Sequence, residues 1–187
     1  MKHLWNYSQK NGYEATSIEE ITATVGVAKG TLYYHFSSKE EIFNFLVEEG
    51  MKLLKNSIEI KTSKLENSID KIKAIILIEL KVLIKYEHVI TIILSQIWGN
   101  ESRNLSCRSY VLDYIETIEN IIKDGISKGE IIDADSNLIA SSIFGITCST
   151  LIYKMQHNNN FDLQTLYNEY VNTLISGLYP QSTNREE

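Results

Sequence analysis

Apolar residues recur every three or four positions along most of this chain, which is the spacing that places them on one face of an α-helix. Runs that alternate between apolar and polar residues, as half-buried strands do, do not appear. Pro180 is the only proline in 187 residues and glycine is sparse, so helix breakers seldom interrupt the pattern. The sequence therefore predicts an all-α fold with about nine helices.

The longer helices are expected after residue 37. Ser38 is a good N-cap residue for a helix from Lys39 to about Ile60. Further helices are expected at residues 68–86, 87–98, 105–127, 136–155 and 163–178. They are separated by Gly99 with Asn100, by Gly129 and by the polar run 157–160.

Residues 16–36 predict two short helices joined by a tight turn. Ser17 can cap the first helix, and Glu20 stands three positions later, where a capping box needs a carboxylate. Gly26 ends this helix, because glycine tolerates a positive φ. A second helix follows at about 29–36. Two helices joined in this way are a common device for placing side chains in the major groove of DNA.

The second short helix has an unusual outer face. With about 100° of rotation per residue, the side away from its small core carries Gly30, Thr31, Tyr33 and Tyr34. Residues 24–39 hold two lysines, one histidine and no carboxylate, in a chain whose formal net charge is −6. Each of these residues alone is typical of an ordinary solvated surface. Together they are what a surface that faces phosphates requires.

The run GVAKGTLYYHFSSKEEIF, from Gly26 to Phe43, closely resembles the signature of the TetR family of one-component transcriptional regulators. The segment GYEATSI, from Gly12 to Ile18, resembles the lead-in to that signature. This resemblance covers about the first 45 residues, and the rest of the chain resembles the family in architecture alone. It implies a DNA-binding domain at residues 1–46 and a helical regulatory and dimerisation domain at 47–187.

The resemblance also implies roles for individual residues. Lys29 would discriminate between bases, since a lysine can donate to O6 and N7 of guanine. Much of the remaining specificity would come from Tyr34, Thr31 and DNA shape. The full implied DNA-binding set is Thr16, Ser17, Lys29, Gly30, Thr31, Tyr33, Tyr34, His35 and Lys39. Within it, Tyr33, His35, Lys39 and the hydroxyls at Thr16 and Ser17 would contact phosphates.

The sequence departs from the family at its amino end. Members of the family usually carry a longer first helix with a flexible, often basic arm, whereas Met1 here lies eleven residues ahead of Gly12. Three interpretations stay open: a start codon assigned too late, a truncated chain, or a regulator with a weakened grip on DNA.

The last two helices are candidates for a dimer interface. The final helix carries an apolar stripe at helical spacing from Leu163 to Leu178. The helix before it carries small residues that allow close approach, namely Ala140, Ser141, Ser142, Gly145 and Ser149. A stripe of this kind is more often ordinary core packing than an interface. The resemblance favours the interface, since family members pair through these helices as a four-helix bundle and bind near-palindromic operators.

The effector site is less well specified. Several expected helices carry aromatic, histidine or sulfur-containing side chains that could surround one mostly apolar cavity: Tyr86, His88, Trp98, Tyr110, Tyr114, Phe144, Cys148 and Met155. The alternative is that these side chains simply pack the core. No cluster of acids or arginines indicates a charged effector, so we expect an apolar or aromatic ligand, such as a fatty acyl chain, a drug or a plant phenolic.

Other classes of function find no support in the sequence. The four histidines are scattered, and no nucleophile elbow, P-loop or dinucleotide-binding glycine motif is present, so we expect neither an enzyme nor a cofactor. Cys107 and Cys148 lack partners at metal-ligand spacing, so no metal is expected. The two cysteines are therefore expected to lie in a reducing cytoplasm. Charged residues interrupt the apolar run 72–97, which argues against a signal peptide or a membrane span.

The sequence thus favours a ligand-controlled, dimeric DNA-binding repressor. The alternative is a helical dimer that binds a small molecule or a partner protein and has lost DNA binding through its short amino end.

Overall fold

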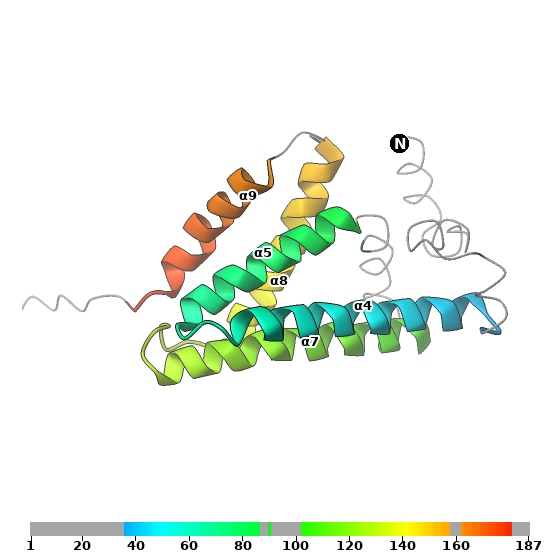
Figure 1. Cartoon of the computed structure of the whole chain (residues 1–187), viewed down its shortest axis with the longest axis horizontal. Coiled ribbons are helices and arrows are strands. Elements are labelled where there is room, and N and C mark those ends of the chain that lie inside the picture. Colours follow the sequence, from blue (N-terminus) through cyan, green and yellow to red (C-terminus); the bar gives the residue numbers. More distant parts are fainter. Residues whose placement is uncertain (1–35, 87–89, 91–101, 158–161, 181–187) are drawn as a thin grey trace, which may run out of the picture. The chain divides into compact units, whose positions relative to one another are not determined.

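The computed structural model describes residues 36–86, 90, 102–157 and 162–180, and it places helices but no strands among them (Figure 1). The α-helices are α4 (Lys39–Thr62), α5 (Ser68–Lys85), α7 (Ser102–Ser127), α8 (Ser136–His157) and α9 (Leu163–Tyr170). A π-helical turn (Val171–Ile175) and a 3-10 turn (Ser176–Leu178) follow α9. The predicted all-α fold is confirmed. The short helices expected before residue 36 and nearly all of the helix expected at 87–98 lie outside the described residues.

Side-chain caps fix where these helices begin. The Ser38 hydroxyl accepts a hydrogen bond from the Glu41 N–H at 3.1 Å, as the sequence predicted for the start of α4. The Glu41 carboxylate in turn accepts the Ser37 N–H at 2.7 Å. Asp162 caps α9 by accepting the Thr165 N–H at 2.8 Å. These contacts satisfy backbone donors that have no partner within the helix.

The end of α7 fixes the beginning of α5. Gly129, with φ of 70°, reverses the chain after α7, and the next N–H, of Glu130, bonds to the Gly125 carbonyl at 2.9 Å. The Glu130 carboxylate then accepts the Ser68 N–H at 2.7 Å. A Cβ at Gly125 would lie 2.7 Å from the Ser68 Cβ, so only glycine permits this close approach between the two helices.

The chain divides into two compact units. The first comprises residues 1–52 and 86–112, and the second comprises residues 53–85 and 113–187, so α4 and α7 each contribute to both. In the second unit α5 packs against both α8 and α9 (Figure 1). Its buried stripe forms the centre of that core and consists of Ile69, Ile72, Ile75, Ile76, Leu80 and Leu83.

The first unit has a small apolar cluster of its own among the described residues. Phe43 and Val47 of α4 pack with Cys107 of α7, and Met51 and Tyr110 cover this cluster. Phe43, Val47 and Cys107 are each at most 3% exposed. The contact joins α4 and α7 within this unit.

The final helix differs from the prediction. The apolar stripe predicts one unbroken α-helix at residues 163–178, but the structure inserts a π-helical turn after Tyr170. The buried positions step by four from Leu166 to Tyr170 and then by five to Ile175. A π turn holds one more residue than an α turn, so it brings Ile175 rather than Leu174 onto the buried side.

None of the helices in the described ranges is both long and apolar enough to cross a membrane.

Candidate functional site

The structure brings together three of the side chains predicted to line an effector site. Tyr114 on α7 is fully buried in the second unit, and its ring meets Phe144 of α8 edge-on, with centroids 5.6 Å apart. Cys148, one turn further along α8, is also buried. Tyr86 and Tyr110 belong to the other unit. His88 and Trp98 lie outside the described residues, and of Met155 the helical backbone alone is described.

An acidic residue that sequence reasoning did not select lies at the centre of this group. The Tyr114 hydroxyl donates a hydrogen bond of 2.6 Å to Oε1 of Glu79, on α5. Glu79 is 2% exposed. Its other oxygen, Oε2, has no hydrogen-bond partner in the part of the chain that the structure describes. A polar atom buried without a partner is uncommon in folded proteins and calls for an explanation.

Burial controls the charge of Glu79. It raises the pKa of this carboxyl from 4.5 to about 7, although the hydroxyls of Tyr114 and Thr147 oppose the shift. The Thr147 hydroxyl donates to the Ile143 carbonyl at 2.7 Å, so its single proton is already engaged. Glu79 therefore changes between a neutral acid and a carboxylate near neutral pH.

The titratable neighbours of Glu79 stay neutral over the same range. Burial raises the pKa of Tyr114 well above its usual value, and it raises that of Tyr170 to about 12. The pKa of Cys148 is also raised, first by burial and then by the nearby Glu79. A thiol in this setting is a poor nucleophile, because thiolate formation is disfavoured. The group can donate and accept hydrogen bonds, but it does not resemble an activated catalytic site.

Helical spacing contained a signal for Glu79. It stands three and four positions after Ile76 and Ile75, within the stripe that α5 buries. The charge of Glu79 was interpreted only as an interruption of an apolar run. Its position on the buried face of α5 indicates instead that this acid is buried.

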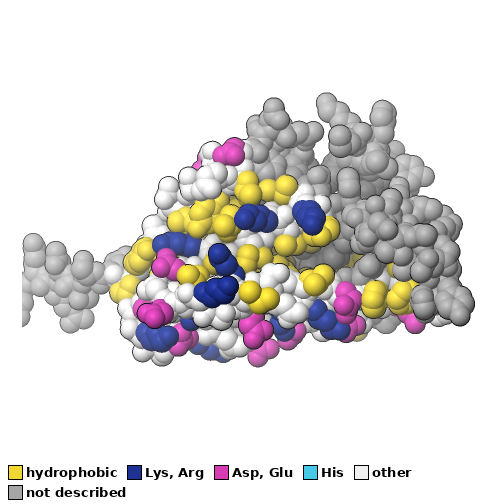
Figure 2. Space-filling model, in the orientation of Figure 1, with side chains coloured by type: hydrophobic (Ala, Val, Ile, Leu, Met, Phe, Trp, Pro, Cys, Tyr) yellow, Lys and Arg dark blue, Asp and Glu magenta, His cyan; other side chains and the backbone are white. Residues whose placement is uncertain are grey.

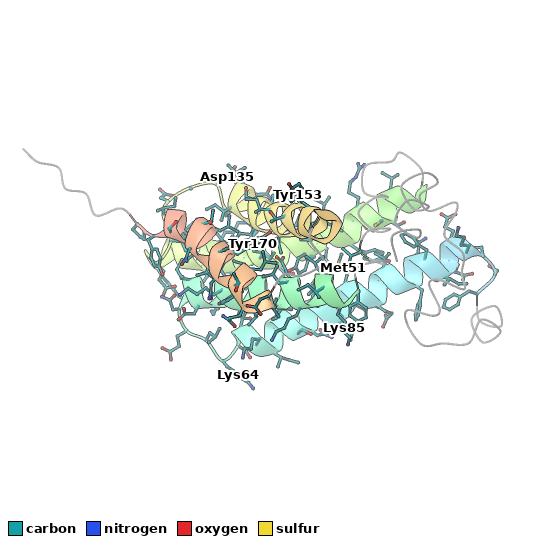
Figure 3. All side chains as sticks on the ribbon, turned by 90° about the horizontal axis from the view of Figure 1, so that it is seen from above. Met51, Lys64, Lys85, Asp135, Tyr153 and Tyr170 are labelled. Carbon is teal, nitrogen blue, oxygen red and sulfur yellow. The ribbon has the colours of Figure 1, made fainter. Side chains whose placement is uncertain are left out.

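Tyr170 links α9 to the same region of α8 (Figure 3). Its hydroxyl donates to the Ile146 carbonyl at 3.0 Å. This contact lies on the stripe for which the sequence left both core packing and an interface open. Leu166, Tyr170, Ile175 and Leu178 are buried within the chain, whereas Leu163, Tyr167, Val171 and Leu174 are partly exposed.

Of the predicted DNA-binding residues, Lys39 alone falls in the described ranges. It is partly buried in the first turn of α4. The others, Thr16, Ser17, Lys29, Gly30, Thr31, Tyr33, Tyr34 and His35, lie outside the described residues. On the face in Figure 2, lysines and acids alternate over α4 and α7, and Lys55 pairs with Asp113 at 2.6 Å. Such an alternating surface does not attract phosphates strongly.

Within the described residues, no group of three or more His, Cys, Asp or Glu side chains could hold a metal ion.

Comparison with known proteins decides the family. The family model for bacterial regulatory proteins of the tetR family matches residues 8–46, and the model for the C-terminal region of YsiA-like proteins matches residues 47–177. The chain belongs to the TetR family. It is therefore a ligand-responsive DNA-binding transcriptional regulator, and its family is one of regulators rather than enzymes.

Known regulators of fatty acid metabolism are similar over nearly the whole chain. The fatty acid metabolism regulator protein of Bacillus subtilis is 27% identical over 91% of this chain and 89% of its own length. A Clostridium perfringens protein assigned as a fatty acid metabolism regulator is 33% identical, with a TM-score of 0.78 over 94% of this chain and 96% of its own. The B. subtilis regulator FadR, solved in complex with stearoyl-CoA, is 25% identical, with a TM-score of 0.74 over 93% and 95% of the two chains.

Proposed function

We propose that this regulator binds a near-palindromic operator as a homodimer and releases it when a long-chain fatty acyl-CoA binds to the regulatory domain, residues 47–187. The similarity to regulators of fatty acid metabolism along almost the whole chain carries this proposal, since one of them was solved with stearoyl-CoA. The buried apolar stripe of α5 supports it, because an acyl chain needs an apolar environment. A protein that blocks a promoter until its ligand arrives acts as a repressor, in the cytoplasm where the DNA lies.

The proposed DNA contacts are those that the signature implies. Lys29, Gly30 and Thr31 would meet base edges, with Tyr34 beside them. Phosphates would be contacted by Thr16, Ser17, Tyr33, His35 and Lys39. This assigns residues 1–46 to DNA binding and residues 47–187 to regulation.

The proposed dimer forms through α8 and α9. One face of α8 stays exposed although it carries apolar and small side chains, namely Leu138, Ser142, Gly145, Ile146, Ser149 and Tyr153. Leu138 is 65% exposed. An exposed apolar face of this kind favours burial against a second copy. Two copies would place their recognition helices about 34–36 Å apart, one turn of DNA.

The proposed coupling runs through α4. This helix begins at Lys39, just after the DNA-reading signature, and continues to Thr62. If the effector favours a conformation in which α4 swings, the two recognition helices no longer match successive major grooves. The ligand can shift operator affinity only by the ratio of its affinities for the two conformations.

The effector is tested by measuring operator binding in the presence of acyl-CoAs. Fluorescence anisotropy with DNA from upstream of the protein's own gene should show specific binding that weakens steeply as salt rises. Palmitoyl-CoA and stearoyl-CoA should release the DNA, whereas coenzyme A alone and free palmitate serve as controls for the two halves of the ligand. Tight acyl-CoA binding that leaves operator affinity unchanged would overturn the proposed coupling. Binding of acyl-CoA without any operator binding would favour the alternative, a helical dimer that binds a small molecule but has lost DNA binding.

The DNA contacts are tested with single substitutions. Tyr33→Ala and Lys39→Ala should weaken binding to all sequences, while Lys29→Ala should relax base preference. Lys64→Ala is the matched control, because this lysine is exposed in the loop after α4 (Figure 3). Normal operator affinity in the Tyr33 and Lys39 variants would refute the phosphate contacts.

The interface is tested by introducing a charge into it. Leu138→Arg on α8 should convert the dimer to a monomer in sedimentation velocity experiments. Leu112→Arg on α7 is the control, because Leu112 is 57% exposed, close to the value for Leu138. Equal behaviour of the two variants would exclude the α8 face.

A further inference from the structure

We propose that protonated Glu79 is the hydrogen-bond donor that recognises the thioester carbonyl oxygen of the effector, and that Tyr114 is the residue that positions it. This inference deepens the proposed function and rests on it, because it assumes an acyl-CoA ligand. It assigns a polar contact to a group that is buried beside the apolar stripe of α5.

The hydrogen bond from Tyr114 decides which carboxyl oxygen faces a ligand. The Tyr114 hydroxyl donates to Oε1 at 2.6 Å, so Oε1 acts as an acceptor. In the neutral acid the proton therefore resides on Oε2. Oε2 is the atom that is buried without a partner in the described residues. The pair thus presents one O–H donor that makes no hydrogen bond within the described residues.

The surrounding side chains hold this donor in place. Tyr114 is fully buried, and its ring meets the ring of Phe144 edge-on, which restricts the orientation of the tyrosine. Thr147 does not donate a proton to Oε2, because its hydroxyl already donates to the Ile143 carbonyl. The carboxyl group is thus held in one orientation before a ligand arrives.

The neutral form of Glu79 makes an acceptor the fitting partner. The groups that interact with it electrostatically are Tyr114 of α7, Cys148 of α8 and Tyr170 of α9. Their pKa values are all raised, so these groups remain uncharged near neutral pH, and none of them stabilises a carboxylate by an opposite charge. Burial then favours the protonated carboxyl. An acyl thioester offers a carbonyl oxygen on an apolar chain, which matches both features.

A pair of ligands isolates this contact. Palmitoyl-CoA carries the thioester carbonyl, whereas S-hexadecyl-CoA has the same nucleotide and an equally long chain joined by a thioether. The wild-type protein should bind palmitoyl-CoA about tenfold more tightly, which corresponds to one well-placed hydrogen bond. In Glu79→Leu the two ligands should bind equally well. In Glu79→Gln the tenfold preference should remain, because the amide N–H₂ of glutamine can still donate.

The pH dependence supplies a readout that a merely structural role would not change. In the wild type the ratio of the two affinities should fall as pH rises above about 7, because the donor loses its proton. The fall should be up to about tenfold per pH unit, until the two ligands bind equally well. In Glu79→Gln the ratio should not vary with pH. Both ligands carry the same phosphates, so titration of the nucleotide cancels in the ratio.

The outcomes separate this inference from the proposed function. If the wild type binds both ligands equally at every pH, Glu79 does not recognise the carbonyl, and the acyl-CoA effector still stands. If a cationic amphiphile such as hexadecyltrimethylammonium binds more tightly as pH rises, Glu79 acts as a counter-ion and the inference is wrong. If the wild type binds neither CoA compound, both proposals fail. Tyr114→Phe keeps the buried ring and should reduce the ratio with less effect on folding than Glu79→Leu, and circular dichroism checks each variant.

Discussion

Two tyrosines four residues apart on α7 each donate a hydrogen bond to a glutamate, and their surroundings give the two glutamates opposite properties. Tyr110 bonds to Glu48 at 3.1 Å, at a partly buried position in the first unit. Tyr114 bonds to Glu79 at 2.6 Å, in the core of the second. The Lys52 ammonium, 2.8 Å from Glu48, lowers the pKa of that carboxyl, and Tyr110 lowers it further. Burial raises the pKa of Glu79 instead.

The difference teaches that the partner of an acid does not by itself determine its charge. Glu48 stays ionised because water and a lysine solvate it, so its contact with Tyr110 joins α4 to α7 at little electrostatic cost. Glu79 lacks both kinds of solvation, and its hydrogen bond to Tyr114 only partly compensates for burial. Burying Glu79 costs folding free energy, which makes this residue a candidate for a functional role. The contact between Glu48 and Tyr110 is explained by its structural role of joining α4 to α7.

The largest expected effect follows from removing the titration of Glu79. The folded state holds its proton up to about pH 7, whereas the unfolded chain releases it near 4.5, so the free energy of unfolding falls as pH rises through this window. Glu79→Gln lacks this loss. At about pH 8 it should be more stable than the wild type by up to the order of 3 kcal/mol, with nearly equal stability at about pH 5. Urea unfolding at both values tests this, and a difference that does not vary with pH would contradict the buried-acid interpretation.

A smaller effect is expected from removing each tyrosine hydroxyl. Tyr114→Phe leaves Oε1 of Glu79 buried without a donor and should cost about 1–3 kcal/mol. The cost should be greater at alkaline than at acidic pH, because the lost hydrogen bond stabilises the carboxylate more than the neutral acid. Tyr110→Phe is the matched control and should cost less, since water can replace its hydroxyl. Equal losses in thermal unfolding would remove the distinction between the two pairs.

The smallest effect is expected at the solvated pair. The pKa of Glu48 is lowered, so its contribution to stability is present above the ordinary glutamate range and is lost as the solution becomes more acidic than that range. Glu48→Gln should therefore differ little from the wild type near neutral pH, and added salt should diminish even that difference by screening Lys52. A large loss of stability that salt leaves unchanged would show that this pair is more buried than its contacts indicate.

The sequence predicted the helices well because their signals are local. The cap at Ser38 and the glycine at position 129 depend on residues within one turn, and both lie where the chain pattern predicted them. Glu79 was missed because it was judged by its charge and not by its place on the buried face of α5, and its partner Tyr114 lies on a helix that is distant in sequence. The residues expected around an effector were likewise chosen by type, and type alone did not separate Tyr110 from Tyr114. Contacts between distant helices made that distinction.

The π turn at Val171–Ile175 is a position at which the final helix can accommodate the deletion of one residue. Deleting the exposed Asn172 or Thr173 would restore a four-residue step from Tyr170 to the next buried isoleucine, leaving the same side chains inside. An equal deletion before Tyr170 would rotate this tyrosine by about 100° away from α8. Natural length variation in this helix should therefore concentrate in these five positions, and alignments of relatives should place their gaps there.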